Sequence, residues 1–219
     1  MMKKTRLTAL VSILLLGLLS LTSCGGFDAK ALLQGNLDVI YLGTYDEEYL
    51  ASVEMTREEA EATYQEGIET EAAFFCDYFD VDWNALNISA QQEILDMYKQ
   101  IYQHSKYEVG EVTRNSDTYL VELTIYPMDI IQKFTDEDSD AFLDSWQNRL
   151  DTGEFDLYTD EEFERAWSHE IVTLISARLD NISYLDPETI SVQIAQDDDG
   201  YYVITDNDFQ RIDGLIIAY

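Results

Sequence analysis

Histidine, proline and basic residues are scarce in this sequence. Their scarcity argues against a histidine-based zinc site, a disordered chain and a nucleic-acid partner. Only 2 prolines stand beside 15 tyrosines, 9 phenylalanines and 3 tryptophans, which argues against disorder and for a packed core. The 2 histidines are His104 and His169. His169-Glu170 begins like the helix motif of zinc peptidases, but no second histidine follows at the required spacing. The sequence also has no glycine-rich phosphate loop and no nucleophile elbow.

The shortage of basic residues gives the chain a strongly acidic character. It has 13 Lys and Arg against 44 Asp and Glu, a formal net charge of −31. Nucleic acid is therefore not expected as a partner, because binding it requires a dense cationic surface. Anionic lipid head groups are repelled as well. A charge of this sign keeps a protein soluble, and it would also attract divalent cations or basic peptides.

The first two dozen residues have the pattern of an export signal. Lys3, Lys4 and Arg6 precede an uncharged, leucine-rich run from Leu7 to Leu21. This run is shorter than the ~20 apolar residues that a membrane-spanning helix needs, and its length suits the apolar region of a signal peptide.

Leu21-Thr22-Ser23-Cys24, followed by two glycines, resembles the lipobox of bacterial lipoproteins. The resemblance implies that residues 1–23 are a lipoprotein signal peptide and that residues 24–26 form a lipidated tether. Lipid on Cys24 would hold the protein outside the cytoplasm on the cell membrane, since several acyl chains together give stable anchoring. The alternatives are an ordinary secretory peptide with a chance cysteine, or an uncleaved anchor helix.

Residues 27–219 are expected to form a single domain that begins with helices. Capping boxes at Thr56–Glu59 and Thr159–Glu162 mark the starts of two helices, and Ser89–Gln92 is interpreted as the start of another. The helix over 138–150 carries Phe142, Leu143, Trp146 and Leu150 as its apolar residues. Apolar residues at helical spacing occur in the segments 27–42, 46–53, 56–79, 89–101, 138–150, 160–180 and 209–216.

Two segments switch to the alternating pattern of strands. Residues 107–112 and 119–125 flank the polar turn Asn115-Ser116-Asp117, and a second hairpin turns at Asp197–Gly200. Because an isolated hairpin is marginally stable, we expect the two to share one sheet. The predicted fold class is α+β: a helical layer packed on an antiparallel sheet of about four strands. An internal helix–hairpin duplication, 27–127 and 128–219, is a further hypothesis.

Three features could bind a ligand. Asp136, Asp138 and Asp140 alternate like calcium ligands, although helix capping also explains them. Asp197, Asp199 and Gly200 match part of a calcium loop, although turn chemistry explains these too. Exposed tyrosines could form a sugar or peptide platform, with cross-strand packing as the alternative. The tyrosines concerned are Tyr126, Tyr158, Tyr184, Tyr201 and Tyr202.

Cys76 has no second thiol to pair with once Cys24 is acylated. It lies in a helical pattern beside Phe75 and Phe79, with no basic residue nearby to activate it, so we expect a buried structural thiol.

The layout of lipobox, helical first half and hairpins rich in Tyr-x-Val and Asp-Gly resembles uncharacterised Firmicutes lipoproteins of unknown-function families. That resemblance implies a location and no activity. We therefore predict a non-enzymatic binding or interaction module with no cofactor, no catalytic residue and no metal site. The conceivable ligands are a basic peptide, a sugar or a divalent cation. The alternatives are the substrate-capturing lipoprotein of an importer and a hydrolase of envelope polymers.

Overall fold

The computed structural model describes residues 27–219, so the predicted leader and Cys24 lie outside the described residues. The described chain divides into two compact units. The first unit contains 27–67, Tyr102–Pro127 and Leu185–Ile216. The second contains Ile68–Ile101, Met128–Tyr184 and Ile217–Tyr219. The single domain over 27–219 and its internal duplication stay predictions.

The first unit is built on one four-stranded sheet in the order β1-β2-β3-β4. The strands are β1 (Lys106–Asn115), β2 (Thr118–Tyr126), β3 (Glu188–Gln196) and β4 (Tyr202–Ile204), and every neighbouring pair is antiparallel. The two predicted hairpins therefore share a sheet, and the predicted α+β fold class is confirmed.

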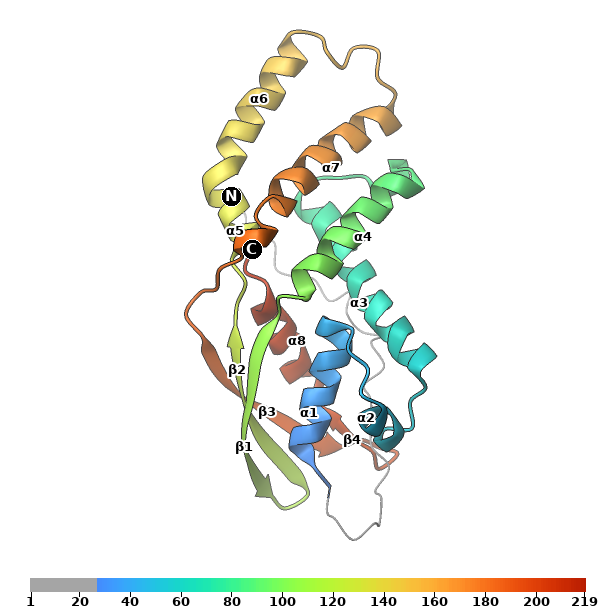
Figure 1. Cartoon of the computed structure of the whole chain (residues 1–219), viewed down its shortest axis with the longest axis vertical. Coiled ribbons are helices and arrows are strands. Elements are labelled where there is room, and N and C mark those ends of the chain that lie inside the picture. Colours follow the sequence, from blue (N-terminus) through green and yellow to red (C-terminus); the bar gives the residue numbers. More distant parts are fainter. Residues whose placement is uncertain (1–26) are drawn as a thin grey trace. The chain divides into compact units, whose positions relative to one another are not determined.

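Burial alternates along the strands because successive side chains point to opposite faces. Val121, Leu123 and Ile125 of β2 are fully buried, whereas Glu122 between them is exposed. Helices α1 (Ala29–Leu37) and α8 (Asp206–Ile216) pack against the sheet (Figure 1). The sheet thus buries one apolar face under helices and leaves the other face polar.

The remaining helices of the first unit begin and end at local signals in the sequence. A π-helical turn, Asp38–Leu42, extends α1 and ends at Gly43, whose φ is 60°. Helix α2 (Glu47–Ser52) is capped by Asp46. The long helix α3 (Arg57–Tyr78) begins at the predicted capping box, in which Thr56 and Glu59 bond each other's backbone N–H, and its chain continues into the second unit.

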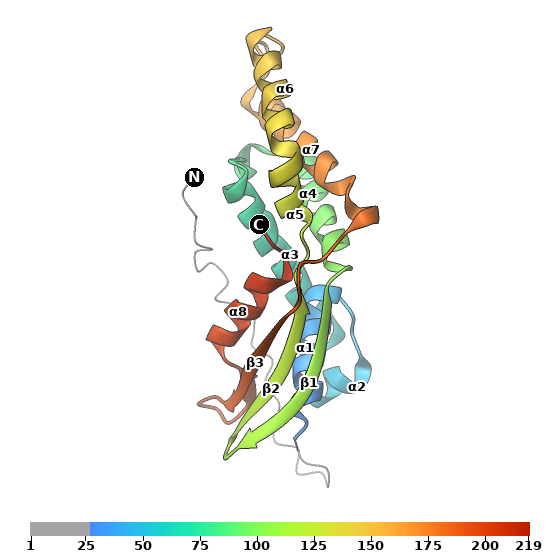
Figure 2. The ribbon, with the colours of Figure 1, turned by 90° about the vertical axis from the view of Figure 1, so that its left-hand side faces the viewer.

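The second unit is helical. Helices α6 (Ser139–Asp151) and α7 (Asp160–Ser176) form an antiparallel pair joined by residues 152–159, as Figures 1 and 2 both show. The Thr159–Glu162 capping box that starts α7 is present as predicted. Besides the second half of α3, the elements are Trp83–Ala85 (a 3-10 turn), α4 (Ile88–Tyr102), α5 (Ile130–Lys133), Phe134–Asp138 (a π-helical turn), α6 (Ser139–Asp151), α7 (Asp160–Ser176) and Leu179–Asn181 (a 3-10 turn).

Aromatic side chains hold α6 and α7 together. Trp146 of α6 lies 5.0 Å from Trp167 of α7 and 4.6 Å from Phe155 of the connecting loop, measured between ring centroids. The indole N–H of Trp167 also donates to the carbonyl oxygen of Phe79 at 2.9 Å. These contacts join α6 to α7, to their connecting loop and to the end of α3.

One local prediction is wrong, the start of α4, and the helical turns before α6 were not predicted. The helix expected over 138–150 is present as α6, but the helical turns α5 and Phe134–Asp138 precede it, and Ile130 and Ile131 of α5 are buried. Helix α4 is capped by Asn87, whose Oδ1 accepts from the N–H of Ala90 at 3.0 Å, so the cap is not at Ser89. Leu143 and Leu150 of α6 are exposed by 50% and 40%.

Candidate ligand pocket

Three chain segments of the second unit meet at Met128 and position the pocket. Met128 forms an antiparallel bridge to Tyr184 and a parallel bridge to Ile217. The N–H of Asp129 donates to the carbonyl oxygen of Ser183 at 3.2 Å. The backbone therefore places Asp129, at the start of α5, directly beside Ser183.

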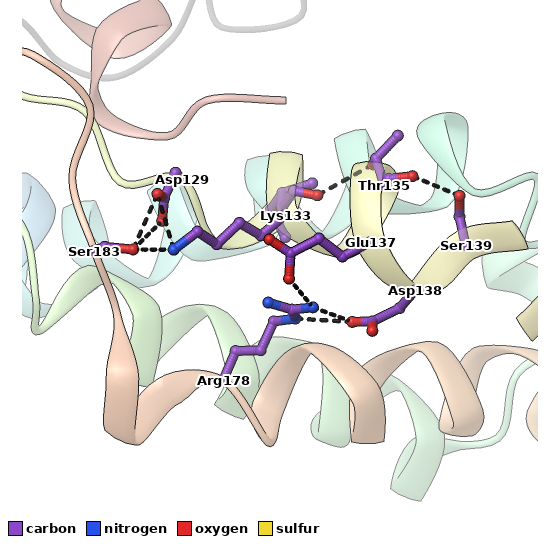
Figure 3. Close-up of polar contacts among 9 residues, drawn as sticks. Asp129, Lys133, Thr135, Glu137, Asp138, Ser139, Arg178 and Ser183 are labelled. Atoms are coloured by element: carbon purple, nitrogen blue, oxygen red, sulfur yellow. Dashed lines mark hydrogen bonds and ion pairs between the residues drawn. The ribbon is translucent and has the colours of Figure 1, made fainter. Parts of the chain in front are cut away.

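A buried carboxylate lies at the centre of this arrangement. Asp129 is only 7% exposed, and both of its carboxylate oxygens accept from the Ser183 hydroxyl at 3.0 Å. The Lys133 ammonium, one helical turn further on, lies 3.3 Å from Asp129 Oδ2 and also donates to Ser183 (Figure 3). The cation and the hydroxyl together compensate the cost of burying the charge.

A second ion-pair group lies beside the first. Arg178, just after α7, donates through Nε to Asp138 Oδ2 at 2.8 Å and through Nη2 to Glu137 Oε2 at 2.9 Å (Figure 3). Burial by itself lowers the pKa of Arg178, but the hydrogen bonds to Asp138 and Glu137 more than offset it, and the pKa is raised. Arg178 therefore stays a cation at the end of α7.

These two groups border a surface pocket of about 260 Å³. This volume is just below the roughly 300–1,000 Å³ of pockets that hold drug-sized molecules, so it suits a metabolite-sized ligand. The pocket is lined by the polar Asp129, Lys133, Arg178 and Asn181 and by the apolar Ile130, Ala177 and Ile182.

The charges around the pocket nearly cancel. Two cations, Lys133 and Arg178, face three carboxylates, Asp129, Glu137 and Asp138, so the local formal charge is −1. Nη1 of Arg178 makes no hydrogen bond to any residue in 27–219, as Figure 3 also shows for the residues drawn. The pocket thus offers hydrogen-bond donors but carries no net positive charge. This combination favours an uncharged or zwitterionic ligand over a simple anion.

The acidic residues considered as calcium ligands are engaged in other ways. Asp138 pairs with Arg178, and Asp136 and Asp140 lie on helical turns instead of a loop. Asp197 Oδ1 accepts from the N–H groups of Asp199 and Tyr201, at 3.0 and 2.9 Å, which closes the turn before β4. Within the described range, no three His, Cys, Asp or Glu side chains are grouped so that they could hold a metal ion.

Three of the candidate tyrosines, Tyr126, Tyr158 and Tyr202, have separate partners within their own units. In the first unit, Tyr202 is buried and stacks on Phe27 at 4.0 Å, and the Tyr126 hydroxyl donates to Glu108 across the hairpin at 2.9 Å. In the second unit, Tyr158 packs edge-on against Phe155. The Tyr126 contact joins β2 to β1 and fits the cross-strand packing alternative, whereas the Tyr202 ring packs on a residue that precedes α1.

Cys76 is buried as predicted, and its pKa is raised to about 12, first by burial and then by Glu164, Asp77 and Asp82. His169 is exposed and pairs with Glu93 of α4, with Nδ1 and Oε2 2.8 Å apart. Neither residue borders the pocket.

The pocket residues were not predicted from the sequence. Its one local signal is the acid–base spacing of Asp129 and Lys133, four residues apart on one helix face. Ser183 and Arg178 lie about 50 residues further along the chain. Nothing in their local sequence shows that they return to this point.

Within residues 27–219, every helix is too short or too polar to cross a membrane.

No family model matches the sequence, and no curated protein matches it. The fold is similar to a solved structure, that of ycdA from Bacillus subtilis strain 168, provisionally assigned as a lipoprotein, with a TM-score of 0.60 at 13% sequence identity. The match covers 85% of this chain and 55% of that one, so the chain spans about half the length of the protein that it matches. At this identity the likeness concerns the fold alone.

Proposed function

We propose that this chain is an extracytoplasmic lipoprotein, anchored through Cys24, that binds a small uncharged or zwitterionic polar molecule in the pocket beside Asp129. The lipobox at Leu21–Cys24 supports the anchor. The fold shared with a protein assigned as a lipoprotein is consistent with it.

The pocket's chemistry is the observation that carries the binding role. Nη1 of Arg178 and the amide of Asn181 offer hydrogen bonds, while Ile130 and Ile182 supply apolar walls. Such a mixture of apolar walls and a few polar groups is typical of small-molecule sites. A sugar-sized ligand with hydroxyl or carbonyl acceptors matches both the donors and the volume.

A binding role without catalysis is preferred because the carboxylates around the pocket are already engaged. Asp129 accepts from Ser183 and pairs with Lys133, and Arg178 binds both Glu137 and Asp138. A general acid or base must instead be able to reach the proton that it transfers. These side chains serve to shape the pocket.

Thermal unfolding with a panel of monosaccharides, neutral amino acids and small amides tests the proposal on the full chain in detergent. A ligand at 100 times its Kd stabilises the folded state by about 2.7 kcal/mol, or about 5–10 °C in Tm for a chain of this size. We expect at least one compound to raise Tm by this amount.

The matched variants are Ala177→Phe, which fills the pocket, and Ala141→Phe on the exposed side of α6. The ligand-induced rise in Tm should disappear in Ala177→Phe and persist in Ala141→Phe. The same rise in both variants, or no rise for any compound in the unmodified chain, would contradict a ligand role for the pocket.

A further inference from the structure

Large apolar side chains of the second unit are exposed along α6, in the loop after it and at the start of α4. Leu157 is 95% exposed and Ile88 is 83% exposed. Exposed apolar groups that gather in one region mark interaction sites more often than scattered ones do. We call Ile88, Leu157 and Tyr158, which lie in the loop before α7 and at the start of α4, the tip surface.

The exposure of Leu157 is built into the loop. Phe155 is buried and stacks on Trp146, and the Tyr158 ring packs edge-on against Phe155 at 5.2 Å. The N–H of Tyr158 also donates to the carbonyl oxygen of Phe155 at 3.0 Å. Since Phe155 and Tyr158, which flank the segment, are both fixed, the loop holds Leu157 exposed to solvent.

Arg149 anchors the same loop from α6. Its guanidinium binds Glu154 in the loop at 2.9 Å and Glu170 on α7 at 2.5 Å. It also lies over the rings of Trp146 and Phe155, at 4.9 and 4.8 Å from their centroids. The only cation in this stretch is therefore used inside the unit and does not offset the acidic surroundings.

Ile88 lies at the same end of the unit. Asn87, the cap of α4, donates through Nδ2 to Glu161 at the start of α7, at 3.1 Å. The N–H of Asp82 donates to Glu164, one turn further along α7, at 3.0 Å. These bonds place the start of α4, and with it Ile88, beside the α7 start that directly follows Leu157 and Tyr158.

The surroundings of these apolar groups are acidic. Residues 139–162 contain eight Asp and Glu, one Arg and no Lys or His, a formal charge of −7. An anionic membrane would be repelled from this surface. So would a second copy of a chain whose net charge is −31.

We propose that the tip surface is a docking site for a basic, amphipathic segment of another polypeptide. Apolar side chains of that segment cover Leu157, Tyr158 and Ile88, and its lysines and arginines meet the surrounding carboxylates. Amphipathic segments of this kind bind matching apolar surfaces through anchors spaced along a helix. This inference does not depend on the pocket or on its ligand.

The test uses the full chain in phosphatidylcholine nanodiscs at 150 mM salt, with the signal of empty nanodiscs subtracted. The probes are two fluorescent peptides of equal length and charge, one of leucine and lysine at helical spacing and one of serine and lysine. Fluorescence anisotropy should show at least tenfold tighter binding of the leucine–lysine peptide, because only that peptide can cover the apolar groups.

Leu157→Ser combined with Tyr158→Ser should weaken binding of the leucine–lysine peptide at least tenfold and leave binding of the serine–lysine peptide unchanged. Leu185→Ser, at an exposed leucine of the first unit, is the matched control and should change neither. Asp144→Asn together with Asp160→Asn should flatten the salt dependence for both peptides.

Three outcomes would overturn the proposal. Equal binding of both peptides would show attraction by charge alone. Stronger binding of phosphatidylglycerol vesicles than of the leucine–lysine peptide, lost in the double serine variant, would make the surface a membrane contact. Concentration-dependent dimers that disappear in that variant would make it a self-association site.

Discussion

At the scale of single residues, Gly35 shows how closely α1 and α2 approach each other. A Cβ atom at Gly35 would lie 2.2 Å from the ring of Tyr49. Tyr49 is buried at 8% exposure and packs across the glycine from α2. Alanine usually stabilises a helix interior relative to glycine, but the ring leaves it no space here.

Gly35→Ala is therefore expected to destabilise the protein by about 1–3 kcal/mol through overpacking. Gly214→Ala in α8, where a Cβ would meet no atom within 4 Å, is expected to stabilise it by about 0.5–1 kcal/mol. Urea unfolding of the two variants gives the comparison. Equal stabilisation by both would show that Tyr49 does not lie over Gly35.

Cys76 provides a second prediction at this scale. With its pKa raised to about 12 by burial and by nearby carboxylates, almost none of the thiol is ionised at pH 8.5. In a Cys24→Ser chain, alkylation of Cys76 by iodoacetamide should be about a thousandfold slower in the native state than in urea. Comparable rates in the two states would mean that the thiol is not buried.

Tyr107 makes the stability of the first unit sensitive to alkaline pH. Burial raises its pKa, and the hydrogen bond that its hydroxyl donates to Asp38 at 2.7 Å raises it further. Because the folded-state pKa lies above the unfolded value near 10, this contribution is complete below pH ~10 and is lost as the pH rises beyond it.

Tyr107→Phe should lower stability at pH 7 by about 1–2 kcal/mol, since a hydrogen bond to a carboxylate is lost. The variant should also lose less stability than the unmodified chain between pH 9 and pH 11. Urea unfolding across that range measures both effects. Parallel pH profiles for the two chains would exclude Tyr107 as the titrating group.

At the scale of elements, helix α4 has two candidate N-cap residues, Asn87 and Ser89, which local sequence alone does not distinguish. Asn87 accepts from the N–H of Ala90, whereas Ser89 lies inside the helix. Asn87→Ala should cost about 1 kcal/mol, and Ser89→Ala should change stability by less than about 0.5 kcal/mol. Guanidinium unfolding of both variants checks the assignment, and the reverse order of the two values would contradict it.

Helices and hairpins were predictable wherever the local signal was complete. The capping boxes at Thr56 and Thr159 and the turn at Asp197–Gly200 depend on hydrogen bonds between residues close in sequence, and tertiary contacts did not override them. Helix α5 was missed because Ile130 and Ile131 form only one turn, too short for periodicity to detect. Periodicity did not show that Leu143 and Leu150 are exposed, because it cannot tell a buried apolar residue from an exposed one.

The pocket could not be predicted, for a different reason. Its polar groups come from the start of α5 and from the segment after α7, and they meet only because Met128 bridges Tyr184 and Ile217. Such long-range pairing depends on the packing of the whole unit. Sequence alone could suggest the Asp129–Lys133 pair and nothing beyond it.

At the scale of the whole molecule, the net charge of −31 affects stability as well as choice of partners. Self-repulsion destabilises a compact state, and salt screens it. Tm should therefore rise between 10 mM and 500 mM sodium chloride. Scanning calorimetry checks this, and a Tm that falls over this range would show that attractive ion pairs outweigh the repulsion.

The proposed lipid anchor at Cys24 would place the pocket and the tip surface at a membrane. Mass spectrometry of the native chain from bacterial membranes tests this most directly. We predict an N-terminal peptide that begins at Cys24 and carries acyl chains, and no such peptide from a Cys24→Ala chain. An intact Met1, or a processed Cys24 without lipid, would contradict the account.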